Sequence, residues 1–169
     1  MGKPVMNPEF WKTRLQGIPE LRYAVYNCPL EDWEEINKHH YKMLTHYIDV
    51  ENDKVLEAGC AFGRWSPLFT NYTGVDISPD FIKIAQKTYP EHVSNFLVGD
   101  LKNLPFPDKH FDWCFTISTK EMIKREINKE TWDIMENELL RVSKKVMILE
   151  YSSSLPSNSN RDNIEILQQ

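Results

Sequence analysis

The sequence predicts an α/β fold, a doubly wound and mainly parallel sheet of about five strands with helices on both faces. Two observations indicate it. Short apolar runs alternate with segments whose apolar residues recur at helical spacing, which is typical of strands joined by crossover helices. A glycine-containing turn, Gly59–Gly63, directly follows the first of these runs, and such turns connect a strand to the next helix in parallel sheets.

The elements follow one another along the chain after a helical N-terminal region. A short helix is expected after the cap Asn7, with Pro8 in its first position, and a longer helix over residues 31–48. The strands are expected at residues 54–59, 72–78, 95–100, 111–118 and 145–151. The helices among them are expected at residues 63–70, from Pro79 after the cap Ser78, and at 128–143. Residues 101–110 are expected to form a loop, because they contain two prolines.

Composition narrows the class of protein. The net charge of −5 gives no broad electrostatic support for duplex nucleic acid, so nucleic acid is not expected as a partner. The three cysteines are far apart in sequence, which argues against a disulfide framework and a thiolate metal site. No apolar window is long enough to span a bilayer, and the N-terminus lacks an apolar signal core, so we expect a cytoplasmic protein without a membrane partner.

Three acidic residues end successive predicted strands: Glu57, Asp76 and Asp100. Ligands bind beyond the carboxyl ends of parallel strands, so these acids are expected at one edge. Ala61 stands where a dinucleotide-binding turn has its second glycine, and the Glu57 carboxylate disfavours a phosphate. Asp76 follows Glu57 by 19 residues, which suits hydrogen bonds from ribose hydroxyls. The pattern favours a phosphate-free nucleoside with a cationic, amino-acid-like tail, the chemistry of S-adenosylmethionine.

Residues 54–151 resemble a class I S-adenosylmethionine-dependent methyltransferase of the group that acts mostly on small molecules. Four segments carry the resemblance in the right order: "VLEAGCAFGRW", "GVDIS", "VGDLKNLPFPDKHFD" and "NELLRVSKKVMILEY". The resemblance implies a Rossmann-like core that binds S-adenosylmethionine and its product S-adenosylhomocysteine. It also implies transfer of the sulfonium methyl group to an O, N or S atom of a small-molecule acceptor.

Carried over position by position, the resemblance implies a role for each matching residue. Gly59 and Gly63 let the main chain surround the methionine moiety, and Glu57 lies near its amino group. Asp76 accepts from the ribose and Ile77 packs on the adenine, whose edge is read by Asp100 and the Leu101 amide. Ile117 and Ser118 line the floor near the methyl group. The complete predicted cofactor set is Glu57, Gly59, Cys60, Ala61, Gly63, Asp76, Ile77, Asp100, Leu101, Ile117 and Ser118.

Simpler interpretations stay open for several of these residues. Gly59 and Gly63 could serve only a tight turn, and Asp100 could cap the loop that follows it. Arg64 and Trp65 could meet the cofactor or only pack. No catalytic residue is identified; Glu121, Tyr151, His39 and His40 are candidates for a general base if one is needed.

The domain organisation follows from the resemblance and its departures. Residues 1–50 are expected to form a helical cap and substrate lid, residues 51–151 the cofactor-binding core, and residues 152–169 a tail. The family usually has seven strands, of which the last two form a hairpin at the sheet edge. The residues after Tyr151 are too few for both strands, so this terminal edge hairpin is expected to be lacking. A homodimer is expected to cover the open sheet edge. The alternative function is a non-catalytic S-adenosylmethionine- or S-adenosylhomocysteine-binding subunit or sensor that acts with a partner protein.

Overall fold

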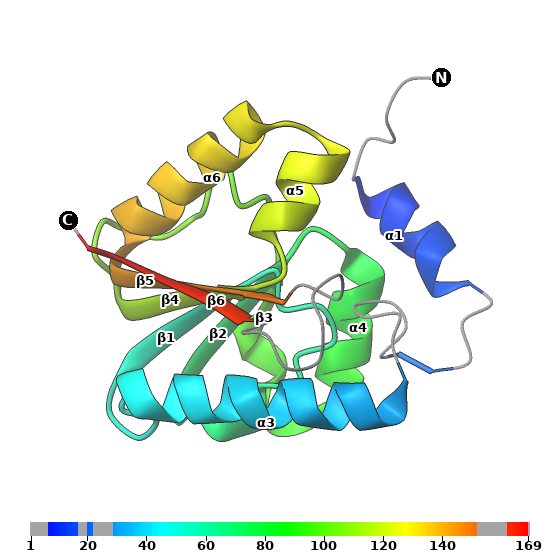
Figure 1. Ribbon diagram of the computed structural model, residues 1–169, viewed down its shortest axis with the longest axis horizontal. Coiled ribbons are helices and arrows are strands. Elements are labelled where there is room, and N and C mark those ends of the chain that lie inside the picture. The colour runs from blue at the N-terminus through cyan, green and yellow to red at the C-terminus, as the bar shows by residue number, and fades with distance from the viewer. Residues whose placement is uncertain (1–6, 17–19, 22–28, 152–161, 169) are drawn as a thin grey trace.

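A computed structural model of the chain describes residues 7–16, 20–21, 29–151 and 162–168 (Figure 1). One six-stranded sheet has the order β3-β2-β1-β4-β5-β6. The first five strands are parallel, and β6 runs antiparallel to β5. The strands are β1 (Lys54–Ala58), β2 (Asn71–Asp76), β3 (Phe96–Val98), β4 (Phe111–Ile117), β5 (Ser143–Tyr151) and β6 (Asp162–Gln168). The predicted α/β class with a mainly parallel sheet is confirmed.

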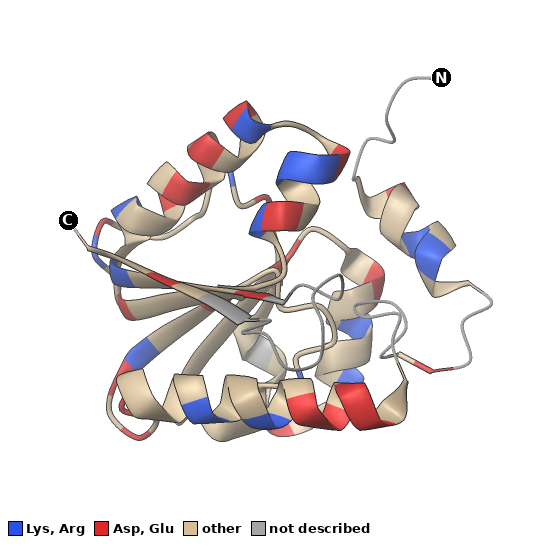
Figure 2. Ribbon diagram, viewed as in Figure 1, with Lys and Arg blue, Asp and Glu red and all other residues tan. Residues whose placement is uncertain are grey.

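Helices cover both faces of the sheet (Figure 1). The helix α3 and the helix α4 lie on one face, α5 and α6 lie on the other, and α1 lies beside α4. The helices are α1 (Pro8–Leu15), α3 (Leu30–Tyr47), α4 (Pro79–Thr88), α5 (Lys120–Glu126) and α6 (Lys129–Val142), with 3-10 turns η1 (Ser66–Leu68) and η2 (Pro90–Asn95). On α3 the acids gather in the first half of the helix and the lysines follow them, whereas α5 and α6 each carry residues of both signs (Figure 2).

The predicted caps form as expected. The Asn7 side chain accepts a hydrogen bond from the Phe10 amide at 3.0 Å, and Ser78 Oγ accepts one from the Phe81 amide at 3.3 Å. Both helices carry proline in the first turn, where a missing amide costs no hydrogen bond. The Ser78 cap fixes the start of α4 directly after β2, at the edge where a ligand is expected.

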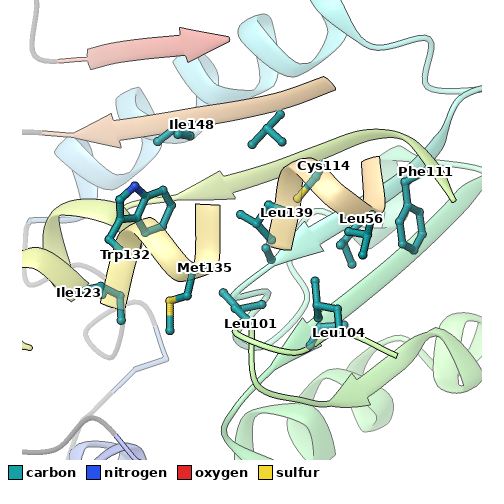
Figure 3. Close-up of a cluster of buried hydrophobic side chains, with 14 residues drawn as sticks. Leu56, Leu101, Leu104, Phe111, Cys114, Ile123, Trp132, Met135, Leu139 and Ile148 are labelled. Carbon is teal, nitrogen blue, oxygen red and sulfur yellow. The ribbon is translucent and has the colours of Figure 1, made fainter. Parts of the chain in front are cut away.

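Two hydrophobic clusters hold the layers together. One lies between the sheet and α5/α6 and joins strand residues such as Leu56 and Cys114 to Trp132, Met135 and Leu139 of α6 (Figure 3). Leu101 and Leu104 of the loop after β3 enter the same cluster. The other cluster lies on the opposite face, and includes residues of α3, α4 and all strands from β1 to β5. The carboxyl ends of the parallel strands are therefore held on rigid, packed elements.

The helix predicted at residues 63–70 is wrong. Only the single turn η1 forms there. Seven residues, 64–70, must lead from the carboxyl end of β1 back to the amino end of β2. A helix of that length rises about 10 Å, whereas strands of this size span about 16 Å, so a more extended path is needed. The helix α5 was not predicted and occupies the segment after β4.

The description of residues 152–169 as a tail also needs correction. Residues 162–168 form β6, which pairs with β5 from Lys145↔Gln168 to Tyr151↔Asp162. The sheet therefore has six strands rather than about five, and one antiparallel edge strand is present where the whole hairpin was expected to be lacking. A partner chain is not required to cover β5, because β6 already pairs with it.

Candidate functional site

The sheet brings most of the predicted cofactor residues to one edge. Strand order reverses between β1 and β4, and ligands bind at such switch points in open α/β sheets. The turn after β1, Asp76 at the end of β2, the segment after β3 and the segment 117–119 at the end of β4 all lie beyond the carboxyl ends. The structure thus groups residues that are up to 61 positions apart in sequence, from Glu57 to Ser118.

The turn after β1 has a backbone that strongly favours glycine at two positions. Gly59 and Gly63 have φ values of 77° and 73°, and Ala61 also lies in the left-handed region at 47°. The amides of Gly59 and Cys60 both donate to the carbonyl of Val75, at 2.8 and 3.1 Å. These bonds tie the turn to β2, so the turn is fixed before any ligand arrives.

The two glycines serve different contacts. A Cβ on Gly59 would lie 3.0 Å from Thr119 Oγ1, so the turn approaches the segment after β4 closely. A Cβ on Gly63 would lie 2.4 Å from the Phe96 ring and 3.1 Å from the Ala85 Cβ. Gly63 is therefore required for packing between the turn, β3 and α4. This close packing was not expected from the sequence, which assigned both glycines to the ligand or to a tight turn.

Asp76 links the turn to α4. Its Oδ2 accepts the Ala61 amide at 2.9 Å, and its Oδ1 accepts the Ser78 amide at 2.8 Å. The side chain is almost completely buried, and burial raises the pKa of Asp76 to about 6 although both amide hydrogen bonds lower it. Each carboxylate oxygen has a second lone-pair direction, so a ribose hydroxyl could still donate to it.

Glu57 lies within the sheet rather than at its surface. It is on the face of β1 that meets α3, is 4% exposed, and accepts a hydrogen bond from the Tyr72 hydroxyl at 2.5 Å. Burial raises the pKa of Glu57 to about 8, against the lowering effects of Tyr72 and Arg64. Glu57 is thus mostly protonated at pH 7 in the ligand-free protein. The buried Cys60 thiol lies beside it, since both Cys60 Sγ and the Tyr72 hydroxyl approach Gly74.

Asp100 caps the loop that follows it, which is the simpler role left open by the sequence. Its Oδ1 accepts the Lys102 amide at 3.0 Å, and its Oδ2 lies 3.2 Å from Lys102 Nζ. The carboxylate is 41% exposed, so it is also open to a ligand. Leu101 is buried in the cluster against α6, and Ile77 is half-buried beside the end of β2.

The segment after β4 forms the opposite side of the edge. Ser118 has a φ of 56°, and its amide donates to the Leu149 carbonyl of β5 at 2.8 Å. Ile117 and Ser118 are half-buried, whereas Thr119 is buried against Gly59. Sequence reasoning missed Thr119, and only the close approach of the two turns identifies it.

The general-base candidates lie in different surroundings. His40 is completely buried on α3, and burial together with the nearby Arg64 lowers the pKa of His40 to about 3, so it is neutral at pH 7. His39 is half-buried on the same helix. Glu121 is exposed in the first turn of α5, 3.8 Å from Lys124 Nζ. Tyr151 ends β5, and its side chain lies outside the described part of the structure.

Glu150, which sequence reasoning passed over, lies at the same edge. Its Oε1 accepts the Lys120 amide at the start of α5 at 2.9 Å. Burial raises the pKa of Glu150 to about 7, while the hydrogen bonds from the amides of Lys120 and Glu121 lower it. Glu150 directly precedes Tyr151, which was chosen as a general-base candidate for its position at the end of the fifth strand. The same position could have identified Glu150 from the sequence.

In residues 7–16, 20–21, 29–151 and 162–168, no three His, Cys, Asp or Glu side chains are arranged to hold a metal ion. In the same ranges, no helix has both the length and the apolar character that crossing a bilayer requires.

Comparison with known proteins adds to this geometry. A curated relative, a fatty-acid O-methyltransferase of Mycolicibacterium smegmatis, is 28% identical over 76% of this chain and 48% of its own length. The chain thus spans about half the length of this relative. The PH0226 protein of Pyrococcus horikoshii has a similar fold, with a TM-score of 0.63 and 24% identity over 85% of this chain and 66% of its own.

A second solved structure is that of a SAM-dependent methyltransferase from Methanosarcina mazei, with a TM-score of 0.56 and 22% identity over 68% of this chain and 59% of its own. The model of the methyltransferase domain family matches residues 56–146, which include the turn after β1, Asp76, Asp100 and the end of β4. With its class I fold and its edge of convergent acids and glycines, the chain belongs to the methyltransferase domain family.

Proposed function

We propose that this chain binds S-adenosylmethionine at the carboxyl edge of the sheet and transfers its methyl group to a small-molecule acceptor. The observation that carries the proposal is the turn Gly59–Gly63, whose left-handed backbone is fixed by the Asp76 carboxylate and the Val75 carbonyl. This is the segment where the family match and the site geometry coincide.

The residues at the edge fit this cofactor better than a phosphate-bearing nucleotide. Asp76 and Asp100 are acids at this edge, and a phosphate beside their carboxylates would be repelled. Asp76 suits the ribose hydroxyls and Ile77 the adenine. The close approach between Gly59 and Thr119 explains by packing why a glycine stands at position 59. The proposal of a main-chain cradle for the tail rests on the left-handed backbone of the turn.

When bound, S-adenosylmethionine supplies a methyl group on a sulfonium, which a lone pair of the acceptor displaces in line. The chain's own contribution is alignment and exclusion of water. In this proposal Asp76 fixes the ribose, the turn fixes the tail, and Ile117 and Ser118 form the floor below the methyl group. An acceptor that is already anionic needs no general base. A neutral hydroxyl acceptor would need one, and the edge position and pKa of Glu150 make it a further candidate.

The acceptor is proposed to be a small molecule that is methylated on oxygen, nitrogen or sulfur. The relative from M. smegmatis is named a fatty-acid O-methyltransferase, so a fatty acid is the first acceptor to test. We further propose that residues 1–50 form the lid over it. Half-buried aromatic residues of α1 support this idea, since Phe10 and Trp11 pack near Phe81 at the start of α4.

The experiment combines a turnover assay with one variant of the site. Purified protein is incubated with isotopically labelled S-adenosylmethionine and a fatty-acid panel, and both the methyl ester and S-adenosylhomocysteine are quantified by mass spectrometry. Asp76→Ala should weaken S-adenosylmethionine binding by about 1–3 kcal/mol, because buried polar partners lose their acceptor. Asp80→Ala, at a half-buried acid in the first turn of α4 that pairs with Lys83, is the matched control and should bind like the wild type.

Each outcome separates two classes of function. Equal amounts of both products would support the enzyme. Cofactor binding without transfer to any acceptor would favour the binding subunit or sensor. Unchanged affinity in Asp76→Ala would show that the ribose assignment is wrong.

A further inference from the structure

The helix α5 begins without a cap from its own sequence. Its N-cap residue is Thr119, whose side chain makes no capping hydrogen bond and donates to the Ile117 carbonyl instead, at 3.4 Å. The first amides of a helix have no partner within the helix and need one from elsewhere. Here a carboxylate of another strand supplies it: Oε1 of Glu150, near the end of β5, accepts the Lys120 amide at 2.9 Å. The Glu121 amide donates to Glu150 as well.

The segment before α5 is held to the same part of β5, which packs beside this helix (Figure 1). The Ser118 amide donates to the Leu149 carbonyl at 2.8 Å, and Ser118 has a left-handed φ of 56°. Such a backbone persists only where the surrounding structure fixes it. Leu149 holds the residue before Thr119, and Glu150 holds the residue after it. Two successive residues of β5 therefore fix the segment 117–119, which lies against Gly59.

Glu150 changes its charge near neutral pH. It is 9% exposed, and burial raises its pKa to about 7, while the two amides lower it. On α5, the Lys120 charge also lowers this pKa and the Glu121 charge raises it. Lys120 Nζ pairs in turn with Glu165 of β6 and lies 6.0 Å from the centre of the Trp132 ring of α6. An ionised carboxylate accepts amide hydrogen bonds more strongly than a protonated one, so ionisation strengthens the hold on α5.

We propose that Glu150 is a positioning residue for methyl transfer, an inference that rests on the proposed function. Its carboxylate holds the start of α5, and through it the segment 117–119 that forms the floor below the methyl group. This role differs from that of a general base, because the contacts of Glu150 are with main-chain amides. Alignment of reacting atoms is sensitive to shifts of about 1 Å, so a loosened floor would slow the transfer.

Two ligands that differ at the methyl group report on this floor. S-adenosylmethionine and S-adenosylhomocysteine share the adenosine and the amino-acid tail, and only the first carries the methyl group and the sulfonium charge. Effects on the shared parts, including the titration of Glu57 and Asp76, enter both dissociation constants alike. The ratio of the two constants therefore isolates the methyl end of the site.

The test measures both constants by calorimetry on the full chain, at pH 6 and pH 8, for wild type and three variants. Glu150→Gln keeps the size of the side chain but cannot ionise. Glu150→Asp keeps the charge but is shorter, so it cannot reach the Lys120 amide in the same way. Glu165→Gln is the matched control, because Glu165 is an acid that pairs with the side chain of Lys120 and not with its amide.

Two further measurements accompany the calorimetry. Thermal unfolding of each variant confirms that it is folded. Hydrogen exchange of the amides of residues 118–121 in the ligand-free protein, followed by NMR, reports the hold on α5 directly and needs no ligand.

The proposal predicts a selective effect. At pH 8, Glu150→Gln and Glu150→Asp should each bind S-adenosylmethionine roughly three- to tenfold more weakly than wild type, as expected for a lost helix cap. Their affinity for S-adenosylhomocysteine should stay within about twofold of wild type. Their Lys120 and Glu121 amides should exchange faster than in wild type, and Glu165→Gln should behave like wild type throughout.

The wild type should also show the effect by itself. Its preference for S-adenosylmethionine over S-adenosylhomocysteine should be weaker at pH 6 than at pH 8, because Glu150 is mostly protonated at the lower pH. In Glu150→Gln the preference should be the same at both pH values. An equal preference at both pH values in wild type would overturn the proposal even if a variant fails to fold.

Other results would overturn it as well. If the Glu150 variants weaken both ligands by the same factor, Glu150 only supports the fold of this edge. If Glu150→Asp binds like wild type and Glu150→Gln does not, the charge of Glu150 matters and its hold on α5 does not. Unchanged constants in both variants would show that the floor does not depend on Glu150, while the proposed function stands. If wild-type protein binds neither ligand, both the inference and the proposed function fail.

Discussion

Glu57 couples the stability of the ligand-free protein to pH. The pKa of this buried carboxyl is raised to about 8, whereas an unfolded chain releases the proton near pH 4.5. Between these values the unfolded state binds fewer protons than the folded state, so the free energy of unfolding falls as pH rises. Asp76, with its pKa raised to about 6, and Glu150, with its pKa raised to about 7, act in the same direction at lower pH.

We therefore expect the wild type to lose stability between pH 6 and 8, and Glu57→Gln to lose about 2 kcal/mol less over that interval. Glutamine cannot ionise and can still accept from Tyr72, which keeps the hydrogen bond at the end of β1. Urea unfolding at both pH values, without ligand, measures the difference. Equal losses in the two proteins would mean that Glu57 is ionised well below pH 8.

The three left-handed residues of the turn should respond differently to substitution. Gly63→Ala places a Cβ at 2.4 Å from Phe96 and should cost about 3 kcal/mol or more of stability. Gly59→Ala meets Thr119 at 3.0 Å and should cost about 1–2 kcal/mol. Ala61→Gly relieves a φ of 47° but frees the unfolded chain, so it should stay within about 1 kcal/mol of wild type. Chemical denaturation of the three variants checks this order, and a Gly63→Ala variant as stable as wild type would contradict the packing role.

At the scale of elements, Arg141 of α6 fixes the loop between β3 and β4. It donates to the carbonyls of Leu104 and Phe106 at 3.1 and 2.9 Å, and to the carboxylates of Asp108 and Glu138. Glu138 in turn accepts the Leu104 amide at 2.7 Å. The proline-rich loop thus takes its shape from a helix that follows it by some 30 residues.

Arg141→Met should lower the urea midpoint clearly, because it leaves two loop carbonyls and the Glu138 carboxylate without their donor. Lys129→Met is the control: Lys129 lies on the same helix and makes a single exposed i,i+4 ion pair with Asp133, which contributes little. Comparable midpoints for the two variants would show that the loop is held by its apolar residues, Leu101 and Leu104, alone.

Across the whole molecule, the parts that could be predicted are those that local sequence determines. The spacing of apolar residues predicted the strands, and the capping residues Asn7 and Ser78 predicted the starts of α1 and α4. The acids at the strand ends could be predicted to converge because parallel strands end at one edge of the sheet. The predictions that were wrong concern features set by contacts between residues far apart in the chain. The helix at residues 63–70 was ruled out by the length of the return path, and β6 depended on pairing with β5.

The candidate site shows the same division. Asp76 was identified from its spacing, but its bond to the Ala61 amide was not, since it depends on how two turns meet. The contacts of Arg64 with Trp33 and Asn37 join α3 to the segment after the glycine turn, and no local sequence pattern predicts such a contact. Burial of Glu57 behind Tyr72 likewise depends on the glycine at position 74 of β2, where a Cβ would lie 2.7 Å from the Tyr72 hydroxyl.

The central claim is that the carboxyl edge of the sheet binds S-adenosylmethionine and its product. Calorimetric titration of the full chain with S-adenosylhomocysteine, with NAD and ATP as comparison ligands, tests it most directly. The account predicts one site per chain for S-adenosylhomocysteine. It predicts no measurable heat of binding for NAD or ATP, because the carboxylates at the edge would repel their phosphates. A folded protein that gives no binding heat with S-adenosylhomocysteine, or that binds ATP as tightly, would contradict it.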